Sequence, residues 1–176
     1  VGFMWGSAQG GGFTWPNVRY ARFSIGGGMT LSDQGQIWNA EYAWAYPAAH
    51  PNDNGDVGGM IAAGGGGVAV PFPAAVAWIA DGYNGETLQP LENVAVAFGD
   101  AGPANNRWGD YYTSRRMHPY GNTWAGGAFV LNGGQTNEFA DPYFVWFGRE
   151  ENGPPDPIIT CPGDVTVECS ATGGTP

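Results

Sequence analysis

The side chains of this chain alternate in character residue by residue along short segments, and glycines and prolines separate these segments. In Trp15–Phe23, for instance, the alternation begins at Val18 and continues to the end of the segment. A period of two places successive side chains on opposite faces of a β-sheet and does not fit an α-helix. The pattern therefore predicts an all-β protein built from short strands.

Three parts of the chain share one plan, in which a Gly-rich strand is followed by a loop and by a second strand with a proline at its entry. The Gly-rich strands are Gly2–Ala8, Val57–Ala63 and Trp124–Val130, and their partners are Trp15–Phe23, Phe72–Ile79 and Asp141–Phe147. The entry prolines, Pro16, Pro73 and Pro142, are 57 and 69 residues apart. A four-stranded propeller blade takes about 40 to 50 residues, so each interval holds one blade and a longer loop.

Two His-Pro pairs give a second marker with nearly the same spacing. His50-Pro51 and His118-Pro119 lie 68 residues apart, and each leads into an Asn- and Gly-containing turn of the kind that joins antiparallel strands. We expect Gln36–Trp38 and Val94–Gly99 to supply outer strands. The sequence thus predicts two to three antiparallel four-stranded blades, a partial β-propeller over Val1–Glu150.

Composition and charge narrow the classes of partner. The 176 residues include 31 glycines and 14 prolines, a density that disfavours long helices. The 16 acidic residues outnumber the 6 arginines and give a net charge of −10, which argues against nucleic acid and an anionic membrane surface as partners. No apolar stretch reaches the about 18 residues of a membrane-spanning helix, so we expect no membrane insertion. Because Val1–Trp5 already reads as the middle of a strand, we expect the chain to be a fragment.

A family resemblance rests on the run Asn106–Tyr112, followed by His118-Pro119, Trp124 and Phe144–Arg149. This combination resembles the closing blades of secreted bacterial β-propellers of the sialidase and Asp-box group. The resemblance implies an extracellular or cell-surface location.

The segment Ser32–Trp38 resembles a decayed Asp box, a motif that reads Ser-x-Asp-x-Gly-x-Thr-Trp. Asp33, Gly35 and Trp38 match in spacing, whereas the serine comes one place late and Ile37 replaces the threonine.

The C-terminal part of the chain changes in composition. Residues 151–157 are Pro-rich and are expected to form a stiff linker. The following stretch, residues 158–176, resembles the start of a hyalin-repeat (HYR) module, an immunoglobulin-like sandwich of secreted proteins. Cys161 and Cys169 are the chain's two cysteines, and an extracellular setting favours their forming disulfides. They pair with each other or with cysteines outside this chain, and the first alternative is our expectation.

The residue types of a sugar-processing site gather in one cluster, whose members are Trp108, Asp110, Tyr111, Arg115 and Arg116. A glycosidase needs two carboxyl groups about 5 to 9.5 Å apart, and a sialidase-like site also needs arginines that grip a substrate carboxylate. We take the five residues as the candidate ligand-binding site, and the catalytic residues of an enzyme would be the same ones without Trp108. The simpler interpretation, which we favour, is that Asp110 caps a turn and both arginines form ion pairs between blades.

Calcium is the one cofactor for which the sequence offers ligands. Asn52, Asp53 and Asp56 surround a glycine turn and carry the hard oxygen donors that calcium prefers. The turn lacks the twelve-residue loop with a terminal bidentate Glu, and Asx-Gly turns are common without a metal. Zinc motifs such as Cys-x-x-Cys are absent, and so is the phosphate-binding Gly-x-x-x-x-Gly-Lys motif, because the chain has no lysine.

The sequence is compatible with three functions. We favour a non-catalytic extracellular or cell-surface module for adhesion or assembly, which binds glycan or protein. One alternative is a part of a secreted sialidase-like glycoside hydrolase or lyase. The other is a structural subunit of an extracellular fibre, whose partners would be the remainder of a propeller or neighbouring copies of the chain.

Overall fold

The computed structural model describes residues 1–68, 70–105 and 107–149, which form ten β-strands and one 3-10 turn. Sheet I consists of β1 (Gly2–Ser7), β2 (Asn17–Ser24) and β3 (Thr30–Ile37). Sheet II consists of β4 (Ala43–Pro51), β5 (Val57–Gly64), β6 (Ala74–Ala80) and β7 (Glu92–Phe98). Sheet III consists of β8 (Thr113–Arg116), β9 (Trp124–Leu131) and β10 (Ala140–Phe147), with η1 (Asn137–Phe139) before β10.

The predicted all-β, antiparallel fold is confirmed, because every paired strand in the three sheets is antiparallel to its neighbour. The three strand pairs expected from the repeat are β1–β2, β5–β6 and β9–β10. The two expected outer strands lie at sheet edges, in β3 and β7. Sheet II has the four strands expected of one repeat, whereas sheets I and III have three each within the described residues.

Strand β4 is an element that the sequence pattern did not predict, because it carries two prolines, Pro47 and Pro51. Its pairing with β5 shifts register between Ala45 and Ala48, and Tyr46 in that bulge has φ 52°. β4 is an edge strand of sheet II. A bulge on an edge strand is a place where a proline removes no hydrogen bond of the ladder.

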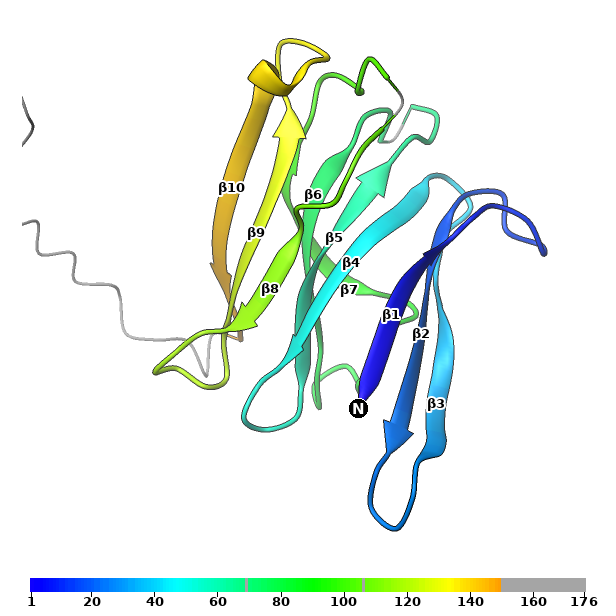
Figure 1. The fold of residues 1–176 in the computed structure, drawn as a ribbon, viewed down its shortest axis with the longest axis vertical. Helices are drawn as coiled ribbons and strands as arrows, with labels where there is room; N and C mark the ends of the chain where they lie inside the picture. The colour runs from blue at the N-terminus through cyan, green and yellow to red at the C-terminus, as the bar shows by residue number, and fades with distance from the viewer. Residues whose placement is uncertain (69, 106, 150–176) are drawn as a thin grey trace, which may run out of the picture.

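The three sheets lie side by side in the order of the sequence, with sheet II in the middle (Figure 1). Strand β4 contacts β1 on one side and β8 on the other, so the first strands of successive sheets are neighbours. Both central strands of sheet II are buried along almost their whole length. Sheet II therefore supplies one face to each of two hydrophobic cores.

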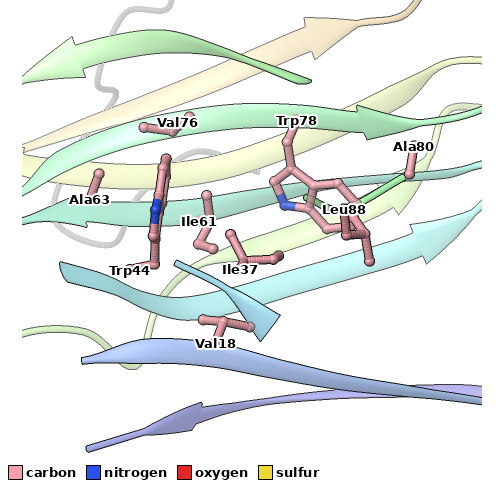
Figure 2. Close-up of a cluster of buried hydrophobic side chains, with 9 residues drawn as sticks. All are labelled: Val18, Ile37, Trp44, Ile61, Ala63, Val76, Trp78, Ala80 and Leu88. Atoms are coloured by element: carbon pink, nitrogen blue, oxygen red, sulfur yellow. The ribbon is translucent and has the colours of Figure 1, made fainter. Parts of the chain in front are cut away.

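The larger core fills the space between sheets I and II (Figure 2). Sheet II contributes two indole rings, those of Trp44 and Trp78, which are 4% and 1% exposed. Sheet I contributes the fully buried aliphatic side chains Val18 and Ile37. Burying a side chain of this size contributes about 1.5–3 kcal/mol, so this junction is a principal source of stability.

The second core lies between sheets II and III. Sheet II presents Met60 and the alanines Ala75 and Ala77. Sheet III presents the ring of Trp124, which is 1% exposed, and the partly buried ring of Phe147, the two rings being stacked with centroids 5.8 Å apart. At both junctions, the buried tryptophans come from the later sheet in the sequence.

Two adjacent glycines of β5 allow rings to lie directly on the strand. A Cβ on Gly58 would lie 2.6 Å from Cε2 of Trp124, and a Cβ on Gly59 would lie 2.5 Å from Cε2 of Trp78. The indole of Trp124 cannot move away freely, because its Nε1 donates a hydrogen bond of 2.7 Å to the carbonyl of His50 on β4. Ser114 of β8 also donates to the carbonyl of Gly58, at 3.1 Å.

Arginines reinforce both junctions from the outside. Arg22 of sheet I donates to the Glu86 carboxylate at 2.8 Å, and Arg116 of sheet III pairs with Asp53 in the β4–β5 turn. Arg149, which follows β10, makes more hydrogen bonds to carboxylates than the other two arginines do. Its guanidinium grips both carboxylate oxygens of Asp81, at 2.7 and 2.9 Å, and also bonds to Glu92.

The electrostatics of this last cluster are those of a tight ion pair. Hydrogen bonds from Arg149 hold the pKa values of Asp81 and Glu92 below the ordinary carboxyl range, and the same bonds raise the pKa of Arg149. The side chain of Asp81 is only 7% exposed, so its charge depends on this partner.

The predicted linker (residues 151–157), the predicted HYR start (residues 158–176) and the cysteines Cys161 and Cys169 lie outside the described residues. Within the part that the structure describes, no helix has the length and apolar character needed to cross a membrane.

We predict that Gly58→Ala destabilises the protein by about 1–3 kcal/mol, since the new methyl group would overlap a ring that is fixed by a hydrogen bond. Thermal unfolding would show a Tm lower by several degrees. The matched control is Gly6→Ala on β1, where an added Cβ meets nothing within 4 Å and the Tm should not change. Equal effects of the two substitutions would contradict the close packing of sheets II and III.

We predict that Arg149→Gln lowers the free energy of unfolding by about 2 kcal/mol at neutral pH, because it leaves Asp81 buried without its cation. A carboxylate whose pKa is depressed by folding stabilises the protein above its unfolded-state pKa, and this contribution is lost as pH falls through the folded-state pKa. The difference between wild type and variant should therefore shrink below about pH 4. Denaturant titrations over a pH series measure it, with Arg19→Gln, an exposed arginine without an ion pair among the described residues, as the control.

Candidate functional site

A cleft of about 1090 Å³ opens at one end of sheet III, where two strands separate. β8 pairs with β9 only from Thr113 to Arg116, opposite Gly127 to Trp124. Beyond Gly127, β9 continues to Leu131 and pairs with β10 alone. The segment before β8 does not pair with β9 as a strand, and its residues 107–111 form one wall of the cleft.

Aromatic rings line this wall around Phe129 of β9. The ring of Trp108 lies over Phe129 with centroids 4.4 Å apart and an interplanar angle of 35°. Tyr111 lies 6.5 Å from the same ring and is 78% exposed. Tyr112, whose centroid is 6.0 Å away, is partly buried. The cleft therefore combines a fixed pair of rings with one ring that faces solvent.

The backbone of the wall adopts left-handed conformations at two successive residues, Gly109 with φ 114° and Asp110 with φ 76°. A side chain at Gly109 would overlap the ring of Tyr46 from the β4 bulge, so only glycine fits there. Below this turn, the hydroxyl of Tyr112 donates to the carbonyl of Phe129 at 3.1 Å. Burial raises the pKa of Tyr112 and keeps the hydroxyl protonated as a donor.

Polar groups also line the cleft. Gln135 and Asn137 come from the β9–β10 connection and Arg107 from the aromatic wall. Arg107 makes no ion pair with any described residue. Among the described residues that line the cleft, Asp110 supplies the one carboxyl group. Such a lining can stack on a flat apolar surface and hydrogen-bond hydroxyl or carboxylate groups at its rim.

The structure brings together three of the five residues of the predicted ligand-binding cluster. Trp108, Asp110 and Tyr111 line the cleft, whereas Arg115 and Arg116 do not. Arg116 forms the ion pair with Asp53 of sheet II, the between-sheet role considered as the simpler interpretation. Arg115 donates to the adjacent carbonyl of Ser114 at 2.8 Å. The two arginines are thus separated from the cleft because β8 carries them away along its length.

Sequence reasoning missed three contributors to the cleft, namely Arg107, Phe129 and Asn137. Arg107 is the neighbour of a predicted residue, so its position in the Arg-Trp-Gly-Asp-Tyr run was an available signal. Phe129 lies inside a predicted strand, and no sequence motif around it indicated a binding site. Its role depends on the separation of β8 from β9, which no local pattern in the sequence shows.

The predicted calcium ligands lie together in the β4–β5 turn, and hydrogen bonds engage their oxygens. The amide oxygen of Asn52 accepts the backbone N–H groups of Asn54 and Asp56, both at 2.9 Å. The Asn52 amide nitrogen donates to the Asp56 carboxylate at 2.9 Å, and Asp53 is paired with Arg116. No group of three or more His, Cys, Asp or Glu side chains suited to a metal occurs among the described residues. These contacts describe an Asx turn held by its own hydrogen bonds.

The segment Ser32–Trp38, which resembles an Asp box, runs through β3 and one residue beyond it. The Ser32 hydroxyl donates to the carbonyl of Arg22 at 3.1 Å, and Asp33 lies 3.8 Å from the guanidinium of the same arginine. Both contacts stay within sheet I.

In comparisons with known proteins, the chain matches no protein-family model, no curated protein and no solved structure.

Proposed function

We propose that this chain is part of a non-catalytic extracellular module that binds carbohydrate in the aromatic cleft of sheet III. The observation that carries the proposal is the exposed ring of Tyr111 beside the Trp108–Phe129 pair, in an open cleft with amide and guanidinium groups at its rim.

Carbohydrate fits the two kinds of surface in the cleft. A pyranose ring presents a flat patch of C–H groups that packs on an aromatic face, and a rim of hydroxyl groups that needs hydrogen-bond partners. Tyr111 and Trp108 offer the rings, and Gln135 and Asn137 offer donors and acceptors. Arg107 is placed to pair with a sugar carboxylate, because no described carboxylate occupies its guanidinium.

Binding is favoured over hydrolysis by the number of carboxyl groups. Glycoside hydrolysis generally uses two carboxyl groups about 5 to 9.5 Å apart, and the described lining supplies only that of Asp110. A sialidase-like reaction would also draw on Arg115 and Arg116, which lie outside the cleft.

The same proposal includes a finer description of the fold, in which sheets I, II and III are successive blades of a partial β-propeller. In support, each sheet is an antiparallel meander, and β1, β4 and β8 succeed one another at neighbouring positions (Figure 1). Ligand sites of such folds lie at one end of the blades, as this cleft does.

We predict that the full chain binds a subset of an immobilised array of neutral and carboxylate-bearing oligosaccharides. Tyr111→Ala should weaken binding to the best oligosaccharide at least about tenfold, or 1.4 kcal/mol, because it removes the exposed ring. Arg107→Gln should weaken binding to carboxylate-bearing sugars more than to neutral ones. Isothermal titration calorimetry with the selected oligosaccharides measures both effects.

The matched control is Phe98→Ala, which removes an exposed ring, 63% accessible, on β7 outside the cleft and should leave the affinity unchanged. Absence of binding to every oligosaccharide, or equal losses for Tyr111→Ala and Phe98→Ala, would refute the proposed site. Release of reducing sugar by the wild-type chain would refute the non-catalytic role.

A further inference from the structure

Asparagine followed by glycine is the sequence in which a side-chain amide is lost most readily, because glycine leaves the approach of its own backbone nitrogen unhindered. Each such pair among the described residues lies in a connection between strands. The pairs are Asn54-Gly55, Asn84-Gly85 and Asn132-Gly133, and a further one, Asn152-Gly153, lies outside the described residues. The surroundings of each pair decide whether this chemistry is open to it.

The pair at Asn84 is held through its side-chain amide. Oδ1 of Asn84 accepts the backbone N–H of Asp81 at 3.0 Å, and Nδ2 donates to the carbonyl of Ile79 at 3.0 Å. The residue is also half-buried. Turning its Cγ toward the nitrogen of Gly85 would break both hydrogen bonds, so the fold protects this pair.

The pair at Asn132 is held by two carboxylates. Nδ2 of Asn132 donates to the Asp141 carboxylate at 3.0 Å, and the backbone N–H of Gly133 donates to the Asp100 carboxylate at 2.7 Å. The second bond engages the nitrogen that would have to attack, and the negative charge beside it disfavours loss of its proton. The fold therefore protects this pair as well.

Asn54, in the turn between β4 and β5, has neither kind of protection. Its side chain is exposed, and its amide makes no hydrogen bond with any described residue. The N–H of Gly55 makes a long hydrogen bond of 3.3 Å to the carbonyl of Asn52. A Cβ added at Gly55 would meet nothing within 4 Å, so the space around the attacking nitrogen is open.

We propose that Asn54 is a site of spontaneous deamidation. The backbone nitrogen of Gly55 loses its proton and bonds to Cγ of Asn54, while the bond from Cγ to the side-chain nitrogen breaks and ammonia leaves after taking up a proton. A water molecule then opens the succinimide ring at one of its two carbonyl groups, which leaves either aspartate or isoaspartate at position 54. The reaction uses water alone as a co-reactant.

The modification acts on the junction of sheets II and III, because the same turn contacts both. Asp53, next to Asn54, donates its backbone N–H to the carbonyl of Gly121 at 2.9 Å and pairs through its carboxylate with Arg116. Isoaspartate adds one atom to the backbone between two N–H groups that bond to the side chain of Asn52. The longer turn cannot keep these bonds and its contacts with sheet III together, so conversion loosens the junction.

Peptide mapping by mass spectrometry tests the site on the full chain, kept in mildly alkaline buffer and sampled over weeks. Asn54 should deamidate at least about fivefold faster than Asn84 and Asn132, the controls within the same chain. The rate should rise with pH, since the attacking nitrogen must lose a proton. In denaturant the three rates should approach one another, because the protection comes from the fold. Equal rates in the folded chain, or an Asn54 that stays unmodified, would overturn the proposal.

Thermal unfolding of the incubated samples tests the effect on the junction. Incubated wild type should have a lower Tm than fresh protein, whereas incubated Asn54→Gln should keep its Tm, because a glutamine closes a ring far more slowly. Asn54→Asp, which carries the charge without the extra backbone atom, should unfold near the fresh wild type. A Tm that is unchanged after conversion, or that falls equally in Asn54→Gln, would refute the loosening. Neither outcome depends on carbohydrate binding, since Asn54 does not line the aromatic cleft.

Discussion

Two indole rings lie directly on adjacent glycines of the central strand β5, one on each face of sheet II, and the packing on both faces depends on these contacts. Trp78 covers Gly59 on the side of sheet I, and Trp124 covers Gly58 on the side of sheet III. Each ring lies where a Cβ would be. Trp124 belongs to sheet III, so a larger residue at Gly58 would push sheets II and III apart, whereas Trp78 belongs to sheet II and lies flat over the neighbouring strand. The hydrogen bond from Trp124 to His50 fixes sheet III in orientation as well as in distance. An indole ring therefore covers each face of β5, and the two glycines of that strand are a requirement of this packing.

The position of sheet III has a direct consequence for the cleft. Trp124 and Ser114 anchor the paired part of β8 and β9 against sheet II, and the pairing ends just beyond them at Gly127. The preceding segment then passes over Tyr46 at Gly109 and lays Trp108 on Phe129 of β9, which creates the aromatic wall. At the other end of sheet III, Arg149 ties the chain to Asp81 and Glu92 of sheet II. Sheet III is thus fixed to sheet II at one end and forms the open cleft at the other, an arrangement suited to binding.

Local patterns predicted most of the strands but not the contacts between sheets. The alternation of side chains and the entry prolines located β1, β2, β5, β6, β9 and β10, because both features act within a hairpin. Strand β4 was not predicted, because a proline such as Pro47 normally argues against a strand. It is tolerated here because β4 is an edge strand with a bulge at this position. Asp53 and Arg116 meet across 63 positions in sequence, and Phe129 joins the cleft through a gap between strands. Such long-range neighbours follow from the stacking of sheets, which no single segment encodes.

The most direct test of the glycine–indole packing is the proton NMR spectrum of the full chain. Ring currents from Trp124 and Trp78 should move the Hα resonances of Gly58 and Gly59 well upfield of ordinary strand glycines, with nuclear Overhauser contacts to the indole protons. Trp124→Leu should return Gly58, and not Gly59, toward the ordinary range. Glycine resonances at ordinary positions in the wild type, without contacts to either indole, would contradict the account.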